Sequence, residues 1–209
     1  MWLLGRWGRV GGWVWGCGVG EGPGVAAWSR PWPGAVDVWR AGENRLTLGR
    51  PARFGVLDEA LGTGPVGYWD QANALVVTLD DGHPESHAPE AVLAAGNRIA
   101  VEREAGAWEV IAFCHAALQA PGRYRLTGLL RGLGAGYCEP APLGSRVVLL
   151  DTACQALPLS PHERGVELAL RAGEAGLDPL DNAATVRSAP PPRADLEPLP
   201  PAHLRLSRT

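Results

Sequence analysis

Apolar and polar residues alternate along several short stretches in the middle of the chain, and this period of two is typical of β-strands. The alternation lies within IAVE, WEVIAF and RYRLTGLL; WEVIAFCHAAL is the longest predicted strand, and NALVVTLD and SRVVLLD are predicted as further strands. Only the short breaks AGA and APG separate IAVE, WEVIAF and RYRLTGLL from one another. Because short glycine-containing turns join antiparallel neighbours, we predict an antiparallel three-stranded meander over residues 97 to 131.

Further strands are predicted on both sides of this meander. AVDVW follows the turn-forming PWPG, and GVELALRAG comes after SRVVLLD. One helical turn is expected from Pro89 to Ala95, because Gly96 and Asn97 then end it. GRPARFGVLDEALGTGPVG is interpreted as loop with one short apolar piece. The predicted fold class is mostly β, with an antiparallel meander or sandwich-like body.

The two ends of the chain lack this alternation. Residues 1 to 27 are rich in Trp and Gly, and Arg6 and Arg9 interrupt the apolar positions, so neither a signal peptide nor a membrane helix is expected. We expect an irregular, disordered leader there. Residues 187 to 209 are rich in proline, which fixes φ and removes a backbone donor, so an extended linker is expected. The β-rich domain is therefore placed at residues 28 to 186.

Composition narrows the classes of partner. The chain has 209 residues, enough to bury a core, and its formal net charge is −3, so we expect neither nucleic acid nor a membrane as a partner. All 19 basic residues are arginine. The four cysteines, Cys17, Cys114, Cys138 and Cys154, fit no zinc framework, and we expect them to be reduced thiols.

Two motifs raise the question of a bound phosphate or metal. In GLLRGLGAG the glycines follow a strand pattern, but a phosphate loop needs a helix next, and Pro140, Pro142 and Gly144 prevent one. We therefore expect a strand that runs into a glycine-rich turn. In DDGHPESH, His83 and His87 would share a helical face, but Gly82 and Pro84 favour a solvated hairpin tip. No cofactor and no metal site is expected.

The remaining candidate residues also have two interpretations. Cys114 and His115 are neighbours in a predicted strand, so they point to opposite faces and cannot act as nucleophile and base. No catalytic residues are expected, and the chain is not predicted to be an enzyme. Trp32 and Trp39 could contact carbohydrate or protein, or fill a small core. Arg131 could bind a partner's carboxylate, or could be a surface or turn-bracing arginine.

Six stretches in order resemble one family of proteins: PWPGAVDVWR, YWDQANALVVTL, AVLAAGNRIAV, WEVIAFCHAALQAPGRYRLTGLLRG, SRVVLLD and LEPLPPAHLR. This series is similar to the C-terminal region of the baseplate hub, or host-specificity, protein of gene transfer agents and related long-tailed phages. The resemblance covers residues 28 to 209. Two departures are Ala95, where the family usually has glycine, and the sequence LGAG after the LLRG motif.

The resemblance implies a structural component of a phage-like tail tip, encoded by a prophage or a gene transfer agent. The chain would be made in the bacterial cytoplasm and assembled into the particle tail. The expected partners are other tail and baseplate proteins and further copies of this chain. The alternative is a module that binds glycan on the recipient cell surface. The family's TIM-barrel-like domain has no counterpart here, so we expect a fragment of such a protein, and no catalytic residue is carried over.

Overall fold

The computed structural model describes residues 18–19, 22–94, 96–103, 108–133, 138–163 and 166–189. These residues form three antiparallel β-sheets with very little helix, which confirms the mostly β fold class. Within them, no helix has the length and apolar character needed to cross a membrane.

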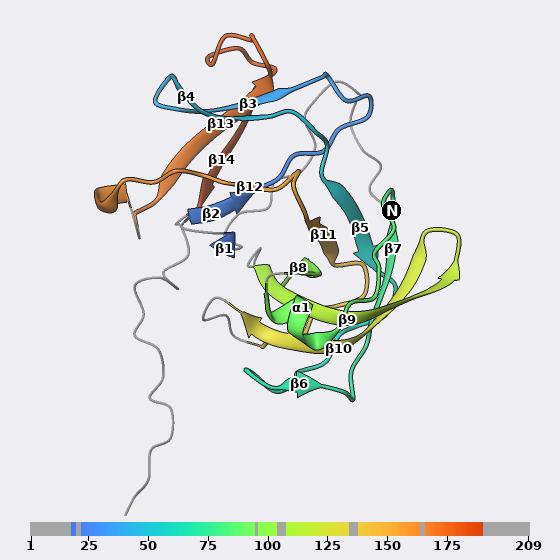
Figure 1. Ribbon diagram of the computed structural model, residues 1–209. Helices are drawn as coiled ribbons and strands as arrows, with labels where there is room; N and C mark the ends of the chain where they lie inside the picture. The colour runs from blue at the N-terminus through green and yellow to red at the C-terminus, as the bar shows by residue number, and fades with distance from the viewer. Residues whose placement is uncertain are drawn as a thin grey trace, which may run out of the picture.

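The largest sheet closes on itself as an antiparallel barrel. Its strands are β5 (Arg53–Leu57), β7 (Leu75–Leu79), β8 (Arg98–Glu102), β9 (Trp108–Ala120), β10 (Arg123–Leu133) and β11 (Arg146–Leu150). They pair in the order β10-β7-β5-β11-β8-β9, and β9 pairs again with β10. The two-residue β6 (Trp69–Asp70) extends the sheet beside β10, and the short helix α1 (Pro89–Leu93) contacts β9 (Figure 1).

The predicted meander is confirmed. β8 pairs with β9 and β9 pairs with β10, both antiparallel, as the alternating pattern requires. The predicted helical turn is also present as α1, and Asn97, with φ of 42°, lies in the turn before β8. Gly128 and Gly132 adopt φ of 64° and 72°, and the β9–β10 register shifts between Leu130 and Leu133. Positive φ suits glycine, so these two positions let a long strand bend around the barrel.

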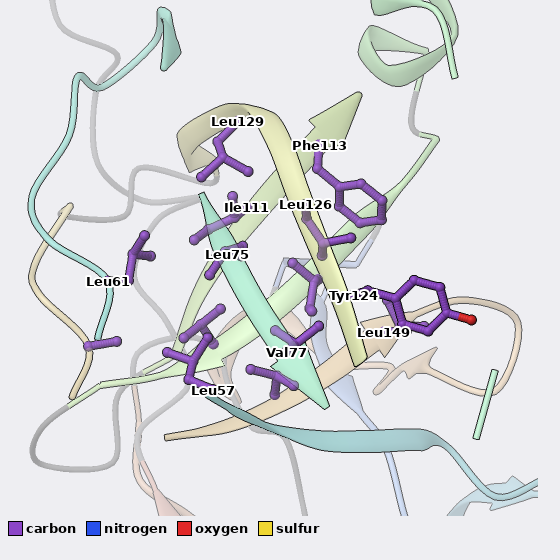
Figure 2. Packing of buried hydrophobic residues seen from close by; sticks show 14 of the residues in the cluster. Leu57, Leu61, Leu75, Val77, Ile111, Phe113, Tyr124, Leu126, Leu129 and Leu149 are labelled. Atoms are coloured by element: carbon purple, nitrogen blue, oxygen red, sulfur yellow. The ribbon is translucent and has the colours of Figure 1, made fainter. Parts of the chain in front are cut away.

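The barrel interior is a packed apolar core. Inward-pointing residues from all six strands meet there, including Leu57, Val77, Ile99, Ile111, Phe113, Leu126, Leu129, Val147 and Leu149 (Figure 2). Val101 and Val147, which pair across β8 and β11, are both 0% exposed. The interior is therefore filled by side chains, as in other small barrels.

Two smaller sheets complete the described structure. A four-stranded sheet has the order β14-β13-β3-β4, from β3 (Val36–Arg40), β4 (Glu43–Leu48), β13 (Leu168–Glu174) and β14 (Thr185–Ala189). A three-stranded sheet has the order β1-β2-β12, from β1 (Gly18–Val19), β2 (Gly22–Val25) and β12 (Gln155–Ala156). A 3₁₀ turn, η2, spans Pro161–Glu163. Figure 1 shows the four-stranded sheet above the barrel, with β2 and β12 drawn between them.

The segment that leaves β2 connects these layers. Val25 and Ala27 pack in a cluster with residues of β3 and β13, whereas Ala26, between them, packs with residues of the barrel strands. All three are 0% exposed, as a strand covered on both faces must be. Ordered structure thus begins before residue 28, within the segment expected to be an irregular leader. Residues 1–17 and 20–21 of that leader lie outside the described residues.

The other predicted strands are present. AVDVW, NALVVTLD, SRVVLLD and GVELALRAG correspond to β3, β7, β11 and β13. β5 lies in the stretch that was interpreted as loop with a short apolar piece. β14 extends to Ala189, past the expected domain end at residue 186, and the remainder of the predicted proline-rich linker lies outside the described residues.

Candidate functional site

Arg131 of β10 and Glu109 of β9 form a buried ion pair inside the barrel. Nε and Nη2 of Arg131 each donate a 3.0 Å hydrogen bond to a different carboxylate oxygen of Glu109. Arg131 is 0% exposed and Glu109 is 2% exposed. The buried Arg103, directly after β8, also forms an ion pair with Glu109. One carboxylate thus lies between two guanidinium groups, and its loss would leave two buried positive charges without their partner.

Arg131 also fixes two loops at this end of the barrel. Its Nη1 donates a 2.6 Å hydrogen bond to the carbonyl of Gly62, and its Nη2 donates a 3.2 Å bond to the carbonyl of Glu139. A β-bridge between Leu61 and Ala141 joins the same two loops. The charged cluster therefore holds a cover over one end of the apolar core.

Asp70 of β6 lies close to Arg131, and the charge of each residue affects the pKa of the other. Burial alone raises the pKa of Asp70, but hydrogen bonds from Asn73 and from the backbone N–H groups of Asn73 and Ala72, together with the charge of Arg131, leave that pKa below its usual 3.8. Burial also lowers the pKa of Arg131. Arginine stays protonated in proteins, so both groups are charged at neutral pH.

The structure places two of the three candidate contact residues, Arg131 and Trp39, away from solvent. Arg131 is not at the surface, and its donors already have acceptors within the barrel. Trp39 is 4% exposed in the four-stranded sheet, against Gly173. Trp32 is half-buried against the cluster around Val36 and Val38, and its Nε1 has no hydrogen-bond partner among the described residues. A partner that approaches from solvent reaches neither Trp39 nor Arg131.

Trp69 and Trp108, which each begin a strand, pack against neighbouring apolar residues. Trp69 packs beside Leu130 in a cluster on the outer side of β9 and β10. Trp108 packs beside Val110 in a second outer cluster, with the guanidinium of Arg146 5.8 Å from its ring centre. Both residues are half-buried, so they serve as packing residues.

The DDGHPESH segment is not a hairpin tip. It belongs to the long connection from β7 to α1, which covers the end of the barrel opposite the Arg131–Glu109 pair. Nδ1 of His83 and the hydroxyl of Tyr124 share a 2.8 Å hydrogen bond. The N–H of His87 donates 2.8 Å to the carbonyl of Cys114, so the segment also covers the edge of β9. The segment is a loop, as Gly82 and Pro84 predicted, and no group of three or more potential metal-ligating side chains occurs in the described part of the chain.

A cavity of about 490 Å³ lies between this connection and the barrel end. Phe113 and Leu149 of the apolar core contribute to it, and Figure 2 shows them with Tyr124 on the same side of the core. The rest of its lining is largely polar and includes Arg53, Asp81, His83, Glu85, Asn97 and Arg98. This cavity is the candidate site for a small polar ligand. Its lining includes residues of DDGHPESH, a motif that raised the question of metal binding in the sequence but did not predict a cavity.

The cysteines and the glycine-rich motif behave largely as the sequence indicated. Cys114 is buried and its neighbour His115 is exposed, so the two side chains lie on opposite faces of β9. Cys114, Cys138 and Cys154 are free thiols. GLLRG is the end of β10, and no helix follows in residues 138–150, as a phosphate loop would require. Residues 134–137, where the turn was expected, lie outside the described residues, as does Cys17.

Sequence reasoning missed Glu109 and Arg103 as partners of Arg131. A signal was present, because Glu109 has the same strand parity as Ile111 and Phe113, which point inward. A carboxylate at an inward position of an apolar strand indicates a buried counter-ion.

A family model matches part of the chain. Residues 52–148 match the model of the family described as Rcc01698-like, C-terminal, a name associated with gene transfer agents. The sequence matches no curated protein. The matched range begins just before β5 and ends inside β11, so it contains all or part of each of the six barrel strands and both members of the Arg131–Glu109 pair. The barrel region of this chain is thus similar to a domain found at the C-terminus of gene-transfer-agent-linked proteins.

Proposed function

We propose that this chain is a structural component of a phage-like tail tip, of the type of a gene transfer agent baseplate hub. The observation that carries the proposal is the coincidence of the family match at residues 52–148 with the closed barrel. A match that follows one folded unit indicates that this unit is shared with the family. The resemblance of the strand series to host-specificity proteins supports the same role.

The character of the barrel also supports a structural role. Its interior is filled by apolar side chains, and its buried titratable groups, Arg103, Glu109 and Arg131, form ion pairs with one another. Catalysis would instead need such groups to converge in an open pocket. The chain would be made in the bacterial cytoplasm, would join other tail and baseplate proteins, and would act without a cofactor or enzymatic activity.

The alternative role, binding of recipient-cell glycan through exposed tryptophan and arginine, has less support from these side chains. None of the tryptophans within the described residues is fully exposed, and Arg131 is buried. A glycan surface of that kind needs aromatic rings that face solvent. We therefore favour the structural role for the barrel.

Analysis of particles tests this proposal. Phage-like particles are purified from the bacterium that encodes the chain and from a strain that lacks its gene, and both preparations are analysed by mass spectrometry. We expect peptides of this chain in the first preparation at a ratio to the other tail proteins that stays constant across gradient fractions. Intact tails from the parent strain without such peptides would contradict the proposal.

A further inference from the structure

Arg98, at the start of β8, has a guanidinium group without a partner. It makes no hydrogen bond or ion pair with any described residue, and its Nε atom is shielded from solvent. A shielded cationic donor without an acceptor is unfavourable, because it has lost water and gained no replacement. Arg98 also lines the 490 Å³ cavity at the barrel end. An acceptor in the cavity would bind the Nη groups of Arg98, which are not shielded and have no partner among the described residues.

Of the two arginines that line the cavity, Arg98 is the one whose charge is available to a ligand. Nη1 of Arg53 lies 3.1 Å from Oδ2 of Asp151, so these two groups neutralise each other at the rim. Asp81 and Glu85 carry exposed carboxylates, which are hydrogen-bond acceptors. Small-molecule pockets are usually lined mostly by apolar side chains, whereas this lining is mostly polar. The cavity therefore favours a polar ligand with both an anionic group and hydrogen-bond donors.

The loop that forms the cavity is held in place from two sides. His83 is hydrogen-bonded to Tyr124 of β10, and Nδ2 of Asn97 donates a 2.6 Å hydrogen bond to the carbonyl of Glu85. These bonds connect the loop to the barrel strand β10 and to the turn before β8. A cavity that is formed before the ligand arrives loses less entropy on binding.

We propose that this cavity binds a small polyhydroxylated carboxylate, which is the chemistry of a sugar acid. Arg98 binds the carboxylate through charge-assisted hydrogen bonds, and the carboxylates of Asp81 and Glu85 accept hydrogen bonds from the ligand hydroxyls. The site is independent of the tail role, because it lies within one chain and needs no partner protein.

Titration of the full chain with D-glucuronate, followed by calorimetry and by NMR chemical shifts, tests the proposal. D-glucuronamide is the matched probe, because it has the same hydroxyls without the charge. We expect saturable one-to-one binding of glucuronate, with shifts centred on residues 81–87 and 97–98, and binding of glucuronamide weaker by about tenfold or more. Equal affinity for the two probes, shifts elsewhere, or no saturation at millimolar glucuronate would overturn the proposal.

A pair of variants locates the site further. Arg98→Gln should weaken glucuronate binding about tenfold or more, whereas Arg125→Gln, an exposed arginine of β10 outside the cavity lining, should leave it unchanged. Thermal melting shows whether each variant is folded. If Arg98→Gln does not fold, the comparison of the two probes on the unmodified chain still decides the question. Full affinity in a folded Arg98→Gln variant would overturn the proposal.

Discussion

Arg131 and Glu109 meet through two parallel hydrogen bonds of 3.0 Å across the paired strands β10 and β9, and neither is more than 2% exposed. A buried bidentate pair of this kind is costly to break from one side, because the remaining charge has no water to replace its partner. The pair lies at the covered end of the barrel, within the domain that resembles the gene-transfer-agent family.

The first prediction concerns this pair. Glu109→Gln removes the one carboxylate between Arg131 and Arg103, so it should lower the free energy of unfolding by about 3–5 kcal/mol. Urea denaturation measures this change. Glu102→Gln is the matched control, because its partner Arg146 has a side chain that is 49% exposed, and it should cost about 1 kcal/mol or less. Equal effects of the two changes would refute the structural importance of the buried cluster.

The second prediction concerns Gly55, which lies in β5 between β7 and β11. A Cβ there would lie 2.2 Å from the backbone carbonyl oxygen of Thr78, and the backbone cannot move aside as a flexible side chain can. Gly55→Ala should therefore lower the free energy of unfolding by about 1–3 kcal/mol or more. Gly49→Ala, where a Cβ meets nothing within 4 Å, should stay within about 0.5 kcal/mol of the parent. Thermal melting of both variants provides the comparison, and a neutral Gly55→Ala would show that the strands are not packed this closely.

The third prediction concerns the thiols. Burial, followed by the negative charge of Asp151, raises the pKa of Cys154 from 9.0 to about 12, and burial, followed by the charge of Glu90, raises the pKa of Cys114. Alkylation of the folded chain at pH 8, read by peptide mass spectrometry, should thus modify the half-buried Cys138 before either of them. Rapid labelling of Cys154 under native conditions would count against its buried position.

The fourth prediction follows from the same raised pKa. Below pH 9 the Cys154 thiol is protonated in both the folded and the unfolded chain, so its contribution to stability is fully present. As the pH rises from 9 to about 12, the unfolded chain loses this proton first, and stability falls by up to about 1.4 kcal/mol per pH unit. Urea denaturation between pH 8 and pH 11 should show a steeper loss for the parent than for Cys154→Ala. Parallel pH profiles would contradict the prediction.

The fifth prediction concerns self-association. Large apolar side chains remain exposed within the described residues, among them Tyr68 at 76%, Leu118 at 64% and Leu180 at 77%. A tail component covers such surface with neighbouring subunits, so the isolated chain should associate. Size-exclusion chromatography with light scattering should give a mass that rises with concentration. A single monomeric species at all concentrations would argue instead for an independent binding domain.

The sequence predicted those elements whose evidence is local. β9 is a long run of strand-forming residues, and β8, β9 and β10 follow one another with short turns, so both their existence and their pairing could be predicted. Barrel closure depends on contacts far apart in the chain. β5 pairs with β11 through Val56 and Arg146, and nothing near either residue indicates this partner. For this reason the sequence pattern predicts a loop where the short strand β5 lies.

The site residues were harder to predict for a similar reason. Arginine is usually exposed, so the residue type of Arg131 predicts a surface position. Its actual position, inward and opposite Glu109, depends on the pairing of the two strands. The cavity beside Arg98 is made by a connection between β7 and α1 together with β5, β8 and β11, and side chains from such separate segments leave no common motif. Only the assembled barrel places them together.

The most direct test of the structural role is the location of the chain in the particle. Antibodies raised against the purified chain are bound to phage-like particles from the bacterium that encodes it, and gold-labelled secondary antibodies are viewed by electron microscopy. Particles from the strain without the gene serve as the control. The proposed role predicts gold at the tail end distal to the head, in the parent particles alone. Complete tails that carry no gold at the tip, with the chain left in the cell extract, would contradict it.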